Sequence, residues 1–305
     1  MFERIWLTAL KLSYQLRAKL GAAPAEPQTT KGSPRMLPEM FREFSDTAWL
    51  AVLRQSTDPF PPFPSPEFQE NFVGSSYEAA LGEAFQFHQL VKGYAAALGR
   101  PLTRKTKFLD FGCGWGRYMR MFWKDFSEEN MFGCDVNDRL MFMNRWSGLP
   151  GQYNGIKNGK PLPYADATFD SMIAYSVFTH LPDALNRAWI AELGRVAKPG
   201  CVAAFTFWPE RFLDYIETEA PKGYSDWLKM LYGHRDSFPA MRKAVKEGGL
   251  AFLDNGGFEL AKAEYGDTIL STAYIQKVWG EHWEVREIID DPSRFVQAVA
   301  ILQKR

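Results

Sequence analysis

The chain has 305 residues, which is long for one average domain and short for two, so we expect one α/β domain with substantial additions. Lys plus Arg equals Asp plus Glu at 36 each, so no overall field would recruit nucleic acid, and a small-molecule partner is favoured. A hydrophobic fraction of 46% excludes a wholly disordered chain.

The cysteines and the apolar runs indicate the compartment. Cys113, Cys134 and Cys201 are scattered in apolar, strand-like surroundings, which predicts buried thiols in a reducing compartment. No apolar run approaches the roughly 18 residues that span a bilayer. The N-terminus lacks the uninterrupted apolar core of a signal peptide. We therefore expect a cytoplasmic protein.

The N-terminal region reads as a helix followed by proline-rich chain. Residues 1–20 have apolar side chains at helical spacing and basic residues on much of the remaining surface, which predicts a basic amphipathic helix. Such a helix can lie on a membrane surface or pack on its own domain or a protein partner, and both alternatives stay open. Residues 21–70 are predicted to be a proline-rich linker or lid: turn-formers make residues 21–38 a flexible linker, and the proline cluster at residues 58–68 is a rigid connector or a lid over the active site.

From Thr106 onward, short apolar runs alternate with amphipathic helices. The predicted strands are Lys107–Asp110, Met131–Asp135, Ser171–Tyr175 and Cys201–Phe207. The predicted helices are Ser76–Leu98, Tyr118–Phe126, Arg139–Trp146 and Leu181–Val196. This alternation predicts an α/β fold with a doubly wound, mostly parallel sheet.

The last third of the chain adds to this sheet. Residues 208–260 are rich in aromatic and charged residues without strand alternation, which predicts a largely helical insertion. Two strand-like runs, Trp283–Ile289 and Val296–Gln303, are joined by a short turn that suits an antiparallel C-terminal pair. Residues 71–305 thus form one predicted domain with insertion 208–260.

A glycine-rich loop in the sequence DFGCGWG is the main functional signal. Gly112, Gly114 and Gly116 follow a strand that ends in Asp110, and a helix begins after them. Glycine permits positive φ and lets a ligand lie against bare backbone, and the helix start adds free amides. The spacing differs from the GxGxxG of nicotinamide dinucleotide loops. Because a carboxylate at Asp110 disfavours a pyrophosphate, the ligand needs a cationic part.

A second acidic residue points to the other end of the ligand. Asp135, in GCDVND, ends the next strand 19 positions after Gly116. An acidic residue at about that distance binds ribose hydroxyls in βαβ sites. The two signals together indicate an adenosine-type ligand with a cationic tail that is not a phosphate. S-adenosylmethionine meets both requirements.

Four ordered segments, LDFGCGWGR, GCDVND, LPYADATFDSMIAYSVFTHL and RVAKPGCVAAFT, carry a family resemblance. Over residues 74–305 the chain resembles the class I S-adenosylmethionine-dependent methyltransferases, which implies a Rossmann-like fold. The SVFTHL segment with the helix end that follows it resembles a bacterial small-molecule subgroup, some of whose members act on sugars or other secondary metabolites.

The resemblance implies a set of cofactor contacts. They are Asp110, Gly112 and Gly114 at the methionine part, Ser176 near the sulfonium, Asp135 at the ribose, and Val136 and Asn154 at the adenine, with Gly116 as a further cofactor-binding residue of the loop.

A methyl transfer needs alignment and water exclusion, and an oxygen acceptor also needs a base. The four histidines are His88, His180, His234 and His282. His180 follows the cofactor-facing end of the fourth strand, so it is the candidate catalytic base, with a helix-capping role as the alternative. The sequence shows no compact cluster of carboxylates and histidines, so no metal is expected.

The acceptor site is the least defined feature. One set of aromatic residues in the insertion could line a pocket or form the insertion's own core: Trp208, Phe212, Tyr215, Tyr224, Trp227 and Tyr232. Tyr265 and the run 270–275 could complete the same wall. By analogy with the subgroup that the chain resembles, an oxygen of a sugar or secondary metabolite is the expected acceptor. A catalytically silent, methyltransferase-like binding subunit is the main alternative, and a nicotinamide oxidoreductase is disfavoured by the glycine spacing.

Overall fold

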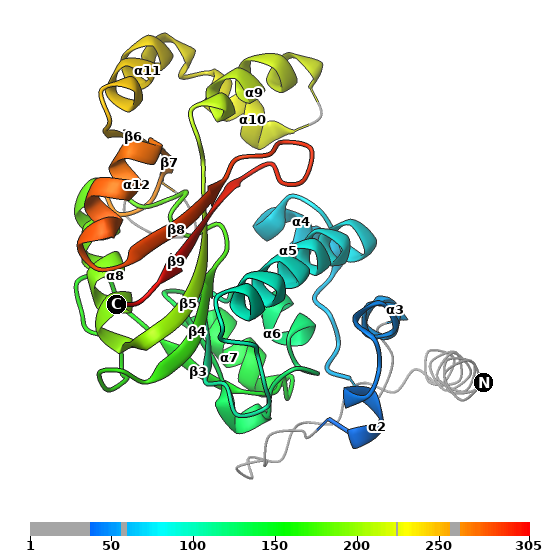
Figure 1. The fold of residues 1–305 in the computed structure, drawn as a ribbon. Coiled ribbons are helices and arrows are strands. Elements are labelled where there is room, and N and C mark those ends of the chain that lie inside the picture. Colours follow the sequence, from blue (N-terminus) through cyan, green and yellow to red (C-terminus); the bar gives the residue numbers. More distant parts are fainter. Residues whose placement is uncertain (1–36, 56–59, 224, 257–262) are drawn as a thin grey trace. The chain divides into compact units, whose positions relative to one another are not determined.

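The computed structural model describes residues 37–55, 60–223, 225–256 and 263–305 (Figure 1). They form two compact units: unit 1 is the described part of Met1–Gly93 with Leu102–Gly155, and unit 2 is Tyr94–Pro101 with the described part of Ile156–Arg305. The expected helix at residues 1–20 lies outside the described residues. Within them, no helix combines the length and the apolar character needed to cross a bilayer.

Unit 1 contains three parallel strands in the order β3-β2-β1. Its elements in chain order are α2 (Glu39–Arg42), α3 (Asp46–Gln55), α4 (Pro66–Val73), α5 (Tyr77–Ala97), β1 (Phe108–Phe111), α6 (Arg117–Met121), the 3-10 helix η1 (Glu128–Asn130), β2 (Met131–Asp135), α7 (Asp138–Trp146) and β3 (Gln152–Gly155). The predicted strands and helices agree with β1, β2, α5 and α7 to within one residue. The helix expected to reach Phe126 is wrong in length, because α6 ends at Met121 and turns follow it.

Unit 2 contains four strands in the order β4-β5-β9-β8. Its main elements are β4 (Phe169–Ala174), α8 (Asp183–Val196), β5 (Ala197–Phe207), α9 (Arg211–Glu219), α10 (Asp226–Tyr232), α11 (Phe238–Lys246), β6 (Leu250–Leu253), β7 (Asp267–Leu270), α12 (Thr272–Val278), β8 (Glu284–Ile289) and β9 (Ala298–Gln303). Short 3-10 helices are η2 (Ala220–Lys222), η3 (Arg235–Ser237) and η4 (Trp279–Glu281).

The strand order confirms the expected fold class. β4 and β5 are parallel, whereas β9 runs antiparallel to both β5 and β8. The antiparallel pairing of the two C-terminal strands is as predicted. The seven strands are ordered β3-β2-β1-β4-β5-β9-β8 and are flanked by helices. This is a doubly wound, mostly parallel, Rossmann-like sheet with antiparallel strands at its C-terminal side.

The segment expected to be a linker or lid is partly helical and packs within unit 1. Trp49 of α3 is fully buried, makes ring contacts with Phe41, Phe60 and Trp123, and donates its indole N–H to the Met121 carbonyl at 2.9 Å. The helical pattern of α3 is short and lies between proline-rich stretches, which obscured it in the sequence. Whether the proline cluster at residues 58–68 also acts as a lid stays a prediction.

The insertion has its own hydrophobic core. The helices α9, α10 and α11 are followed in the chain by the antiparallel pair β6 and β7, and neither of these short strands was predicted. Trp208 and Phe212 are buried in this core with their rings stacked at 3.8 Å. These two residues therefore pack the insertion, whereas Trp227 is 38% exposed and Tyr224 lies outside the described residues.

The packing of α3 gives a stability test. Trp49→Ala should lower the free energy of unfolding by about 3–5 kcal/mol, because it leaves a cavity beside the three aromatic rings that Trp49 contacts and an unpaired Met121 carbonyl. Trp146→Ala is the matched control, because Trp146 is 50% exposed, and it should change stability by less than about 0.5 kcal/mol. Urea denaturation measures both. Equal losses in the two variants would contradict an integral role for α3.

Candidate active site

The glycine loop turns back onto the end of β2. The amides of Gly112 and Cys113 both donate to the Cys134 carbonyl, at 2.8 and 3.0 Å. The loop then continues through Gly114 and Gly116, and all three glycines have positive φ, at 75°, 51° and 78°. Because L residues rarely adopt this conformation, the turn requires glycine at these positions. The expected role of glycine in the turn is confirmed, and the contact with cofactor stays a proposal.

Gly114 and Gly116 serve different purposes. A Cβ at Gly116 would lie 2.1 Å from Cδ2 of Leu149, so Gly116 allows the loop to pack closely on its own unit. A Cβ at Gly114 would meet no atom within 4 Å. Gly114 therefore presents bare backbone to open space, as a ligand-binding glycine does.

Two buried polar side chains that the sequence analysis missed hold the loop carbonyls. Asn144 of α7 donates to the Gly114 carbonyl at 2.8 Å, and Arg120 of α6 donates to the Trp115 carbonyl at 2.7 Å and the Gly116 carbonyl at 3.3 Å. Both side chains are almost completely buried. Asn144 is a polar residue on the apolar stripe of the expected helix Arg139–Trp146, and this signal could have identified it.

Asp110 is a buried acid without a hydrogen-bond partner on one oxygen. Its side chain is 1% exposed, and among the described residues nothing donates to Oδ2. Burial, together with the charge of Asp135, raises the pKa of Asp110 to about 8, although Arg117 opposes the shift. A bound cation would satisfy this oxygen and restore the charged carboxylate. The α-ammonium of S-adenosylmethionine fits that requirement.

Asp135 connects the glycine loop to the end of β2. Its Oδ2 accepts the Gly114 amide at 3.0 Å, and its Oδ1 accepts the Asn137 amide at 2.9 Å. Burial raises the pKa of Asp135, although the backbone amides of Asn137, Gly114 and Val136 oppose this. Since each carboxylate oxygen can accept more than one hydrogen bond, ribose hydroxyls can still bind.

The two predicted adenine residues also belong to this end of unit 1. Val136 directly follows β2 and is half-buried. Asn154 lies within β3, opposite Cys134 in the parallel register, and is half-buried as well. Six of the predicted cofactor residues therefore come from β1 and its loop and from the end of β2, and Asn154 comes from β3.

Ser176, in unit 2, follows β4 in a strained conformation. Its φ is +59°, which a serine rarely adopts. Its amide donates to Thr206 Oγ1 at 2.7 Å, and its hydroxyl accepts from Gln297 at 2.9 Å. Backbone strain of this kind is often found at functional sites. The expected place of Ser176 near the sulfonium stays a prediction.

His180 lies four residues after Ser176 and does not cap a helix. Its Nδ1 lies 2.8 Å from the Gly266 carbonyl, and Pro182 occupies the cap position of α8. Because a carbonyl only accepts, Nδ1 carries the proton and Nε2 of the neutral ring keeps a lone pair. The side chain is 18% exposed and stacks on Tyr265 with ring centroids 4.6 Å apart. His180 can therefore accept a proton at Nε2.

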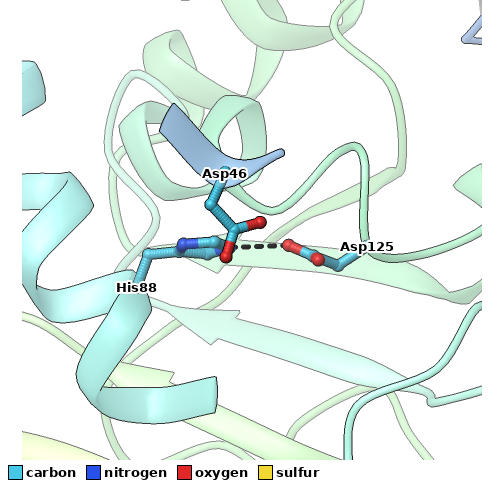
Figure 2. A group of neighbouring side chains, drawn as sticks. All are labelled: Asp46, His88 and Asp125. Atoms are coloured by element: carbon cyan, nitrogen blue, oxygen red, sulfur yellow. Dashed lines mark hydrogen bonds and ion pairs between the residues drawn. The ribbon is translucent and has the colours of Figure 1, made fainter. Parts of the chain in front are cut away.

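A compact group of Asp46, His88 and Asp125 was not predicted, because its members are far apart in the sequence. Figure 2 shows the two carboxylates and the imidazole converging, with His88 Nε2 2.6 Å from Asp125 Oδ2. The ligand-type atoms of the three residues lie within 4.8 Å of one another. By geometry alone, the group could hold a metal ion.

Two ammonium groups already neutralise these carboxylates. Lys92 Nζ lies 2.8 Å from both oxygens of Asp46 and 2.9 Å from Asp125, and Lys124 Nζ lies 2.7 Å from Asp46. Burial opposes ionisation, but the hydrogen bonds and charges around them hold the pKa of Asp46 and of Asp125 below the usual range. A divalent cation would add charge to a balanced network. The group is best explained as an ion-pair network.

The comparisons with known proteins agree with the loop and the fold. Residues 108–200 match a family model described as a methyltransferase domain. Cycloartenol-C-24-methyltransferase 1 from Oryza sativa subsp. japonica is 32% identical over 148 residues, which cover 43% of this chain and 42% of that protein. A tRNA (carboxymethyluridine(34)-5-O)-methyltransferase from Arabidopsis thaliana is 30% identical over 146 residues, covering 47% of this chain and 34% of that protein. The chain thus spans less than half the length of these two curated relatives.

A solved structure supports the fold over a larger part of the chain. The PH0226 protein from Pyrococcus horikoshii OT3 superposes with a TM-score of 0.53 at 15% identity, covering 78% of this chain and 96% of that one. Residues 108–200 therefore match a methyltransferase domain, and the described chain shares its fold with a solved structure, which agrees with the class I S-adenosylmethionine-dependent family and with the cofactor S-adenosylmethionine that the four motifs predicted. The bacterial small-molecule subgroup stays a prediction.

The two glycines give a matched test of the loop. Gly116→Ala should lower the free energy of unfolding by at least about 3 kcal/mol, because the new Cβ meets both a positive φ and Leu149. Gly114→Ala has only the positive φ and should cost about 1–2 kcal/mol. It should nevertheless weaken S-adenosylmethionine binding about tenfold or more. Chemical denaturation and calorimetry measure the two effects, and unchanged affinity in Gly114→Ala would argue against a ligand at Gly114.

The ion-pair network predicts a pH-dependent contribution to stability. Asp125→Asn should lower the free energy of unfolding by about 2 kcal/mol at pH 7. The pKa of Asp125 is lower in the folded protein than in the unfolded chain, where it is near about 4. The carboxylate therefore stabilises the fold fully at a pH above the unfolded-state pKa, and this contribution is lost as the pH falls through the folded-state pKa. The gap between wild type and variant should therefore narrow at pH 3.

Urea denaturation at pH 7, 5 and 3 measures this difference. Asp226→Asn is the control, because Asp226 pairs with Lys229 at the surface and should show no measurable change. A gap of the same size at pH 3 would contradict the network. A chelator should leave the melting temperature unchanged, and a fall on chelation would instead indicate a metal.

Proposed function

We propose that this protein transfers a methyl group from S-adenosylmethionine to an oxygen atom of a small-molecule acceptor, with His180 as the general base. Bound S-adenosylmethionine supplies a methyl carbon on a sulfonium leaving group, so the acceptor oxygen gains a C–O bond and loses its proton while S-adenosylhomocysteine is released. The chain must bind the cofactor, orient the acceptor and remove that proton.

The observation that carries this proposal is the hydrogen bond at His180. The Gly266 carbonyl fixes the proton on Nδ1 at 2.8 Å, which leaves Nε2 as the atom that can receive the acceptor's proton. Figure 1 shows β4 and β5 side by side in unit 2, and His180 comes from the segment between β4 and α8. In open α/β sheets, ligands bind beyond the carboxyl ends of the strands, where this segment begins. Its position therefore suits a base that acts on a bound acceptor.

The acceptor is proposed to be a sugar or another secondary metabolite. The balanced charge of the chain favours a small molecule over a polyanion. The relatives differ in kind, because one is named for methylation at C-24 of cycloartenol and the other for a carboxymethyluridine of tRNA. Tests of the acceptor should therefore include tRNA beside hydroxylated sugars and sterols. The proposed locations are the cytoplasm and, through residues 1–20, a membrane surface or a protein partner.

Substitution of the base tests the proposal. His180→Gln should lower kcat by about 100-fold or more, because proton removal by a positioned base contributes that much or more. The Kd for S-adenosylmethionine should stay within about twofold, because His180 is not among the predicted cofactor contacts. His234→Gln is the control, since His234 is exposed in the insertion. Release of S-adenosylhomocysteine and a mass increase of one methyl group on the acceptor measure turnover.

Two results would overturn the proposal in different ways. Wild-type turnover in His180→Gln would remove the base while leaving methyl transfer intact. Cofactor binding without turnover on any acceptor tested would instead favour the silent binding subunit. Absence of S-adenosylmethionine binding at millimolar concentration would reject the enzyme and leave the silent subunit as the function.

A further inference from the structure

Backbone hydrogen bonds hold His180 opposite the start of β7. The Gly266 amide donates to the His180 carbonyl at 3.1 Å, and the Thr268 amide donates to the Thr179 carbonyl at 2.7 Å. The Thr268 hydroxyl also donates to the Leu181 carbonyl at 2.8 Å. Residues 179–181 are therefore fixed against residues 266–268, and Asp267 is the residue at the centre of that contact.

Asp267 is a buried carboxylate that is only half satisfied. Its side chain is about nine-tenths buried, and its Oδ2 accepts a hydrogen bond from Asn255 Nδ2 at 2.7 Å. Among the described residues nothing donates to Oδ1, which lies 3.8 Å from Nδ1 of His180. That distance is too long for a hydrogen bond but short enough for a strong effect of charge.

His180 is the ion-pair partner of the Asp267 carboxylate. In the described chain, His180 is the one basic side chain within ion-pair distance of Asp267. The other titratable groups on the neighbouring segments have partners of their own: Tyr265 stacks on the imidazole, Glu264 accepts from Asn158, and Asp183 of α8 is bonded to Arg187 and Tyr274. An unpaired buried carboxylate is costly, and this cost falls when the imidazole gains a proton.

We propose that Asp267, held by Asn255, is the positioning residue of His180 and stabilises the imidazolium that forms when Nε2 takes the acceptor's proton. This inference rests on the proposed function of His180. Asp267 does not touch the acceptor. Its part is to place a negative charge beside Nδ1 while the Gly266 carbonyl fixes the ring, so that Nε2 becomes a stronger base.

The charge of His180 can be measured without any turnover. The chain has four histidines, so the spectrum of protein with ¹⁵N-labelled histidine is simple, and the signal missing from His180→Gln identifies His180. In Asp267→Asn the pH at which His180 titrates should fall by about one unit, because an opposite charge within 4–6 Å has been removed. With an acceptor in hand, kcat should fall about tenfold at unchanged Kd for S-adenosylmethionine, and the acid limb of the pH profile should move with the titration.

Two further variants keep the test decisive. Asp267→Glu returns the charge and should recover part of both the titration midpoint and kcat, which a merely structural role would not do. Asp254→Asn is the control, because Asp254 is exposed in the same part of unit 2. A titration midpoint in Asp267→Asn equal to that of wild type overturns the inference. If wild type methylates no acceptor tested, the proposed function fails, and the midpoints still decide whether Asp267 sets the charge of His180.

Discussion

The bond between the Asp135 carboxylate and the Gly114 amide is the contact on which the cofactor end depends. It joins the loop after β1 to the end of β2, while Asn137 occupies the other oxygen and begins α7. The loop is thereby held open over Gly114, where a Cβ would meet no atom. The same contact brings a second acid close to Asp110, so that burial and, after it, the charge of Asp135 raise the pKa of Asp110. A pair of acids held this way is stabilised by a cationic ligand and would repel an anionic one.

The cofactor end could be predicted from the sequence because its information is local. The turn from strand through glycines to helix, the acid before it and the acid that ends the next strand all lie within 26 residues, from Asp110 to Asp135. Each of these features is imposed by backbone geometry or by the charge of the ligand. The supporting residue Asn144 was missed because its bond to Gly114 depends on how α7 packs. A helical pattern gives the buried face of a helix but not the carbonyl that a polar side chain on that face will meet.

The acceptor end could be predicted only in part, because its contacts are long-range. His180 was found from its place after a strand, but the carbonyl that fixes its proton is 86 residues away. The strand β7 that carries Asp267 has four residues, too few for alternation to be recognised, and β3 was missed for the same reason. In the N-terminal segment, prolines on both sides hid the apolar stripe of α3. Short elements of this kind are stabilised by what they pack against and not by their own pattern.

Two histidine–aspartate pairs in this chain show why residue type alone does not define a base. His88 is completely buried, with Asp125 on Nε2 and Gln89 on Nδ1, so neither ring nitrogen remains for a substrate. The ammonium groups of Lys92 and Lys124 moreover balance the charge of Asp125. His180 differs in both respects, because its ring is partly exposed and Asp267 has no lysine or arginine partner in the described chain. A histidine–aspartate pair can therefore move a proton when one imidazole nitrogen is open and no lysine or arginine neutralises the carboxylate. A pair without these two properties only stabilises the fold.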